Sequence, residues 1–195
     1  APKILTKLEL KTSTSHYVNG ADGVHFLKLP DGNYQLIFGE SKTYKEIGKA
    51  INDAFKSIYG FKNGINNKGN RKSGIQYEKS LISDNLFKES FSEEERAFLE
   101  SLIYPTPNRN FDVDDAFGIF LGFQIEISDD EKCLPTADFR RLIRARVDGE
   151  VSKYFKTIQK KIIENKLQGH NFYIYVLPFT DIESKRKKIV EAITK

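Results

Sequence analysis

The chain has 195 residues, 39% of them apolar, which is enough to bury the core of one medium-sized globular domain. Charged residues make up 30%, and the formal net charge of +4 is a mild basic excess that is compatible with a polyanionic partner but does not require one. A single cysteine excludes an intrachain disulfide, and no apolar run approaches the roughly 18 residues of a membrane span, so we expect a cytoplasmic protein without membrane contact.

The N-terminal part of the chain predicts strands. A weak alternation indicates a strand over residues 3–11. Apolar runs at 24–29 and 34–40 flank "PDGN", where Asp31 and Gly32 have the turn chemistry of a two-residue β-hairpin. Such a turn would set Asp22 directly opposite Ser41.

Helical signals follow the hairpin. Thr43 and Glu46 have the spacing of a capping box, ahead of apolar residues at helical intervals that end at Gly60. The polar segment 61–74 indicates an exposed loop. Further helices are expected near 75–86 and 93–103, which makes about 61–110 a helical insertion.

The C-terminal half predicts a strand over 117–127, a helix from Thr136 to about Leu167, a strand over 171–179 and a terminal helix within 181–193. We therefore expect one α/β domain over residues 1–195, with a mixed central sheet flanked by helices. The chain starts at Ala1 and contains no Met, so we expect that an N-terminal element of this domain is missing.

Glu-x-Lys occurs four times in the chain, at residues 9, 40, 164 and 183, so the pattern alone carries little information. The copies at 164 and 183 lie on predicted helices, where a solvated face explains them. Only Glu40 and Lys42 end an apolar strand whose hairpin partner begins with an acid, Asp22. Strict pairing puts Asp22 on the opposite face, so a bulge or a position just outside the strand is required.

These residues suit a metal-dependent reaction on phosphate. The carboxylates of Asp22 and Glu40 and the backbone carbonyl of Ser41 are hard oxygen ligands for Mg²⁺ or Mn²⁺. Lys42 would orient the attacking water and stabilise charge on the phosphate. An ordinary surface Glu and Lys at a strand end is the alternative interpretation.

A rival set contains Asp115, Asp130 and Lys132. Asp115 and Asp130 flank the predicted strand over 117–127. The ends of a straight strand of this length lie roughly 35 Å apart at about 3.3 Å per residue, which is too far for the two acids to share a metal. We therefore exclude this set.

The stretch "GADGVHFLKLPDGNYQLIFGESKTYKEI" resembles the PD-(D/E)xK nuclease superfamily, although no Pro precedes Asp22. More narrowly, "GADGVHF", "FGESKTY" and "DDAFGIFLGF" are similar to the HamA family, the nuclease subunits of Hachiman anti-phage defence systems. The similar motifs cover residues 20–45 and, more weakly, 112–124. The resemblance implies a restriction-endonuclease-like core, magnesium-dependent cleavage of DNA by Asp22, Glu40 and Lys42, and a helicase partner, HamB.

Basic residues outside this motif are candidates for DNA contact, with solvated faces as the alternative. They are Lys62, Lys68, Arg71 and Lys72 in the predicted loop and Arg140, Arg141 and Arg144 on the long helix. We thus expect a DNA endonuclease effector of an anti-phage system. The alternative is a non-catalytic interaction module that binds a helicase partner or a DNA end.

Overall fold

The computed structural model describes residues 3–6, 22–64, 79, 93–104, 107 and 110–193. Within them, five strands form a sheet in the order β1-β2-β3-β4-β5. Their bounds are β1 (Lys3–Thr6), β2 (Gly23–Lys28), β3 (Tyr34–Thr43), β4 (Val113–Gln124) and β5 (Asn171–Phe179). The first three are antiparallel neighbours, whereas hydrogen bonds from Tyr34 to Asp112 and from Tyr44 to Gly122 show that β3 and β4 run parallel. The predicted mixed α/β sheet is confirmed.

The described helices are α1 (Ile47–Asn63), α3 (Glu93–Ile103), α4 (Asp129–Lys132), α5 (Thr136–Glu164) and α6 (Ile182–Ile193). Their order along the chain, and their alternation with the strands, agrees with the prediction except for the short helix α4. The helix expected near 75–86 lies outside the described residues, apart from Lys79. None of the helices that the structure describes is long and apolar enough to cross a membrane.

Both ends of α1 differ from the prediction. Thr43 is the last residue of β3, and the hydrogen bond from Ala50 N–H to Glu46 O closes the first turn of the helix. Thr43 therefore lies too far ahead of the helix to cap it, and the predicted capping box is wrong. At the other end the helix continues past Gly60, because Phe61 packs on Phe38 of β3 with ring centroids 5.1 Å apart. The helix stops before Gly64, whose φ of 61° is the left-handed conformation that commonly ends helices.

The hairpin loop also differs from the prediction. Leu29 N–H donates to Asn33 O at 2.8 Å, and Gly32 N–H donates to Leu29 O at 3.1 Å, so the loop contains three residues rather than two. Gly32 has a φ of 90°, which is the left-handed position of a three-residue hairpin loop. The extra loop residue shifts the register, and Gly23 pairs with Gly39 instead of Glu40. The predicted opposition of Asp22 and Ser41 is therefore wrong.

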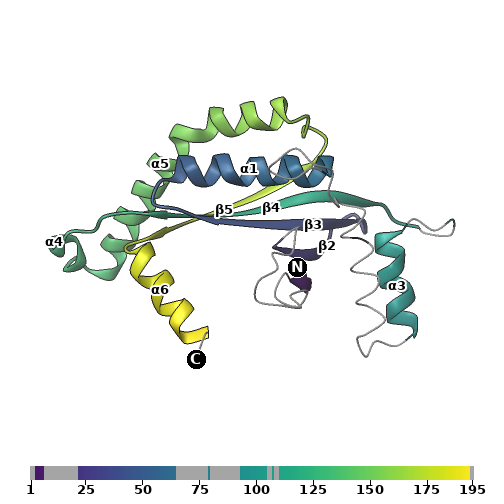
Figure 1. Ribbon diagram of the computed structural model, residues 1–195, viewed down its shortest axis with the longest axis horizontal. Helices are drawn as coiled ribbons and strands as arrows, with labels where there is room; N and C mark the ends of the chain where they lie inside the picture. The colour runs from purple at the N-terminus through teal and green to yellow at the C-terminus, as the bar shows by residue number, and fades with distance from the viewer. Residues whose placement is uncertain are drawn as a thin grey trace. The chain divides into compact units, whose positions relative to one another are not determined.

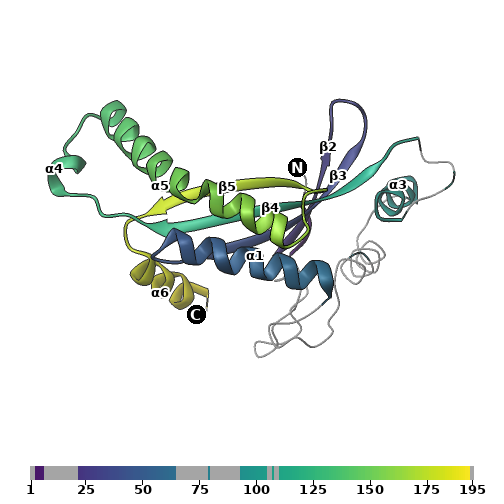
Figure 2. The same ribbon diagram turned by 90° about the horizontal axis from the view of Figure 1, so that it is seen from above.

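The chain forms two compact units, and β3, β4, β5 and α1 each contribute to both. The first comprises Ala1–Glu40, Lys56–Gly118 and Gly169–Tyr173. Its core is aromatic: Phe117 of β4 lies 6.5 Å from Phe38 and stacks on Phe172 of β5 at 5.5 Å between ring centroids. Figure 2 shows the hairpin of β2 and β3 that carries Asp22 and Glu40.

The second unit comprises Ser41–Phe55, Ile119–Gln168 and Ile174–Lys195. In it α5 lies on one side of β4 and β5 and α6 on the other (Figure 1). The first half of α1 packs so tightly on α5 that a Cβ added to Gly48 would lie 2.9 Å from the Tyr154 ring. Lys42, near the end of β3, belongs to this unit, and the segment after β3 leads directly into the packed half of α1.

Candidate functional site

Asp22 and Glu40 come together at one end of the hairpin in the first unit. Asp22 is a half-buried residue just ahead of β2, and its N–H donates to the carbonyl of Gly39 at 2.7 Å. Gly23 already stands opposite Gly39, so this bond leaves the regular ladder. The ladder of β2 and β3 begins at Gly23, so Asp22 lies just outside the strand, which is one of the two positions that the sequence required for its carboxylate to reach the face of Glu40.

Two glycines let the strands approach at this point. A Cβ added to Gly39 would lie 3.2 Å from the carbonyl oxygen of Gly23, which is closer than ordinary contact. A larger residue at position 39 would therefore push the two strands apart. The neighbouring Asp22 is bound to Gly39 through its backbone N–H, so the close approach of the strands helps to position this acid.

Glu40 is buried, with 8% of its surface exposed. The only other buried polar side chain among the described residues is Gln35, whose oxygen accepts a hydrogen bond from the Tyr173 hydroxyl. Glu40 is thus the only buried charged side chain among the described residues. Burial of a carboxylate costs free energy unless other groups compensate it, and such positions are enriched at functional sites.

Ser41 and Lys42 continue β3 into the second unit. The Ser41 side chain is exposed and Lys42 is half-buried. Alternate residues of a strand point to the same face, which puts Glu40 and Lys42 on one face of β3 and Ser41 on the other. Ser41 lies between Glu40 and Lys42 in the chain, and its backbone carbonyl is the third oxygen of the predicted ligand set.

A cluster that the sequence did not predict surrounds Tyr44, directly after β3. The Lys49 ammonium lies over the Tyr44 ring, 4.7 Å from its centroid. A hydrogen bond with Asp53 raises the pKa of the Tyr44 hydroxyl, and the charges of Lys42 and Arg186 act in the opposite direction. The only sequence signal was the basic run "KRKK" at 185–188, which a solvated helix face explained equally well.

Arg186 connects this cluster to the C-terminal helix. Its guanidinium donates to the backbone carbonyl of Thr43 at 2.9 Å, and α6 is also tied to β4 because Ile182 N–H donates to the Gln124 side chain at 3.3 Å. The Arg186 side chain therefore holds the helix against the end of β3.

The structure describes some of the predicted DNA-contacting residues and not others. Lys62 lies in the last turn of α1, half-buried, and not in a loop as predicted. Lys68, Arg71 and Lys72 lie outside the described residues. Arg140 and Arg144 are exposed on α5, whereas Arg141 is paired with Asp138 at 2.6 Å.

Two residues of the rejected rival set, Asp115 and Lys132, have structural partners. Asp115 lies inside β4, earlier than the predicted strand start, and pairs with Lys79 at 3.0 Å. Lys132 pairs with Asp129 at 2.8 Å within the short helix α4. Their charges are thus accounted for by ion pairs.

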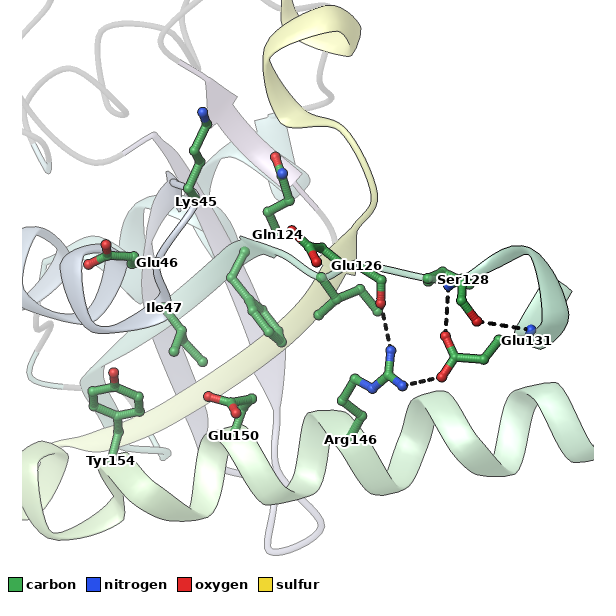
Figure 3. A pocket seen from close by; sticks show the side chains of 13 residues that line it. Lys45, Glu46, Ile47, Gln124, Glu126, Ser128, Glu131, Arg146, Glu150 and Tyr154 are labelled. Atoms are coloured by element: carbon green, nitrogen blue, oxygen red, sulfur yellow. Dashed lines mark hydrogen bonds and ion pairs between the residues drawn. The ribbon is translucent and has the colours of Figure 1, made fainter.

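An open cavity of about 760 Å³ lies in the second unit (Figure 3), and none of the predicted catalytic residues lines it. Apolar side chains such as Phe123 and Ile125 line it together with four glutamates, Lys45 and Arg146. Arg146 is already bound to Glu126 O at 2.6 Å and to the Glu131 carboxylate. The excess of carboxylates makes this cavity unfavourable for a phosphate group.

No three His, Cys, Asp or Glu side chains gather into a metal-binding group among the residues that the structure describes. The predicted set contains only two carboxylates and one carbonyl. Mg²⁺ commonly binds through one or two carboxylates, with water and substrate phosphate completing its shell. The hard oxygen donors of Asp22, Glu40 and Ser41 thus fit such an ion.

A model of the HamA family matches residues 1–193. No curated protein and no solved structure matches the chain significantly.

Proposed function

The chain belongs to the HamA family, and is therefore a protein of Hachiman anti-phage defence, and from this premise we propose that it is a metal-dependent DNA endonuclease. Asp22, Glu40 and Lys42 are the proposed catalytic residues. The expected partners are DNA and a helicase subunit.

The burial of Glu40 is the observation that supports this proposal most strongly. A strand-end acid that served only solubility would point into solvent, as Glu126 does after β4. Glu40 is instead enclosed, next to the residue whose carbonyl fixes Asp22. The two acids thus lie at the same end of the hairpin, which supports a shared role for them.

In the proposed reaction Asp22, Glu40 and the Ser41 carbonyl hold Mg²⁺. When bound, the ion polarises the phosphate and stabilises the developing negative charge. The Lys42 ammonium, on the same strand face as Glu40, orients the attacking water and neutralises charge on the phosphate oxygens. Burial around Glu40 excludes bulk water, which strengthens these charge interactions.

A non-catalytic interaction module is the second candidate, and the cavity of the second unit favours it. Its lining combines apolar side chains with charged ones, as many protein-docking surfaces do. In that case Glu40 and Lys42 would be structural, and removing them would leave any nuclease activity of the complex unchanged.

Plasmid nicking separates the two candidates. Supercoiled plasmid would be incubated with Mg²⁺, the helicase partner and one of three proteins: the wild type, Glu40→Gln or Lys42→Ala. We expect nicking to slow at least about a hundredfold in both variants, because each removes a group that acts in the transition state. Removal of the metal with EDTA should abolish nicking.

Glu164→Gln is the matched control, since Glu164 belongs to another Glu-x-Lys copy and is exposed at the end of α5. It should nick at the wild-type rate. Wild-type protein that does not nick, or variants that nick as fast as the control, would contradict the nuclease assignment and favour the interaction module.

A further inference from the structure

In the second unit, β5 forms an edge of the sheet. It is the last strand in the described sheet, so it has a strand neighbour, β4, on one side only. Phe179 O accepts a hydrogen bond from Ile125 N–H at 2.8 Å, and main-chain groups alternate in direction along a strand. The N–H and C=O groups of Ile174 and Val176 therefore point away from β4. Pro178, which lacks an N–H, shares this outward register, where it interrupts no bond to β4.

Apolar side chains beside this edge are exposed on both faces of the sheet. Ile174 and Val176 are half-buried and share one face of β5. Tyr175 and Leu177 share the other face, where 65% and 50% of their surface is exposed. Because α5 crosses over β5 (Figure 2), it covers the half-buried face, yet its Phe155 side chain is 59% exposed. A strand added at this edge would therefore bury apolar groups on both of its faces.

One stripe of α5 continues from the sheet to beyond β5. Ile158 is the only buried residue of this helix, all of which the structure describes. The same stripe extends toward the N-terminus at steps of three or four residues, through Phe155, Val151, Val147, Arg144 and Arg140. Tyr154 packs against Gly48 of α1, so Phe155, on the other flank, faces the β5 edge. The N-terminal half of α5 extends beyond β5 (Figure 2), so the stripe overhangs the place where a sixth strand would lie.

The charge of this stripe identifies the kind of segment that fits beneath it. Arg140 and Arg144 are exposed, and neither forms an ion pair with a residue that the structure describes, unlike Arg141, which pairs with Asp138. Acidic side chains on an added segment would pair with these two cations. The sequence of β5, "NFYIYVLPF", contains no acid, so the same strand of a second copy would leave them unpaired. Charge complementarity thus favours a different protein over a second copy of this chain.

We propose that an extended segment of a partner protein pairs with the outward edge of β5 beneath α5. The segment is apolar beside Phe155 and acidic where it reaches Arg144 and Arg140. Main-chain hydrogen bonds to Ile174 and Val176 supply affinity, and the side-chain contacts supply specificity. This rests on the proposed function, in which a helicase subunit is the expected partner.

Titration of the helicase subunit into the fluorescently labelled chain, without DNA or ATP, tests this assignment. Arg144→Glu should weaken binding at least about tenfold, because it sets a carboxylate against the acids of the segment. Phe155→Ala should weaken binding about tenfold through the loss of an aromatic anchor. Lys156→Glu makes the same change of charge on the opposite side of α5, and Ile163→Ala truncates a side chain that is 60% exposed and lies off the stripe. Both controls should bind as the wild type does.

Equal affinity of Arg144→Glu and Lys156→Glu, or no binding of the helicase by the wild type, would overturn the proposal. Sedimentation velocity of the chain alone covers the other occupant, since self-association that Phe155→Ala abolishes would assign the edge to a second copy. Binding that depends on Arg144, in a protein that never nicks DNA, would refute the nuclease function alone. Nicking that depends on Glu40, with helicase affinity indifferent to Arg144, would refute the docking edge alone.

Discussion

Glu131 takes part in three hydrogen bonds around the short helix α4, two with Ser128 and one with Arg146. Its carboxylate accepts from Ser128 N–H at 2.9 Å, its own N–H donates to the Ser128 hydroxyl at 3.3 Å, and Arg146 of α5 binds its other oxygen. The bond from Arg146, followed by that from Ser128, lowers the pKa of Glu131. The charged carboxylate is therefore favoured in the folded chain, so its contribution to stability is present above the ordinary glutamate pKa and is lost as the pH falls through the lowered value.

We accordingly predict that α4 loosens on acidification only below the ordinary glutamate range. An NMR titration of the Glu131 side chain should give a midpoint below that of an unstructured glutamate. In Arg146→Ala the midpoint should move back toward the ordinary value, because the main cause of the shift is gone. A wild-type midpoint at or above the ordinary value would show that the Arg146 bond does not form.

At the scale of elements, glycines decide how closely neighbouring segments approach. Gly122 of β4 faces Thr43 and Phe179, and an added Cβ would lie 2.7 Å from the Thr43 hydroxyl and 2.9 Å from the Phe179 ring. Gly149 on α5 has no neighbour within 4 Å of such a Cβ. The two glycines therefore serve different purposes, although the sequence does not distinguish them.

Alanine at these two positions should have opposite effects on stability. Gly122→Ala overpacks the contact with Thr43 and should lower the free energy of unfolding by about 1–3 kcal/mol. Gly149→Ala adds helix propensity without a clash and should raise it by up to about 1 kcal/mol. Chemical denaturation measures both, and a Gly122→Ala protein as stable as the wild type would contradict the close packing of β3 and β5 on β4.

For the whole molecule, the net charge of +4 hides an uneven distribution of charge. Cations gather around Tyr44 and along α6, whereas carboxylates gather in the cavity between α5 and the segment after β4. The two regions thus differ in the charge of the ligand that each suits.

We predict that the helicase partner controls cleavage by this chain. Its addition, with ATP and DNA, should change the rate of plasmid nicking at least about tenfold, a coupling typical of two linked sites. Helicase alone and helicase with Glu40→Gln are the controls. The same nicking rate with and without the helicase would show that the chain acts on its own.

Among the described elements, the sequence by itself determined the identity and order of all except the short helix α4, because apolar periodicity is a local property of strands and helices. It also placed Glu40 and Lys42 on one strand end, since alternation along a strand is local too. Asp22 was selected from its position before the hairpin. Membership of the HamA family was visible in the motifs around residues 20–45.

Only the tertiary structure decided how these parts meet. The loop of three residues, closed by a glycine with positive φ, set the register and brought Asp22 to Gly39. Lys49 and Arg186 reach Tyr44 from helices that precede and follow most of the chain. Register depends on a single loop residue and clusters depend on long-range packing, and neither leaves a periodic signal in the sequence.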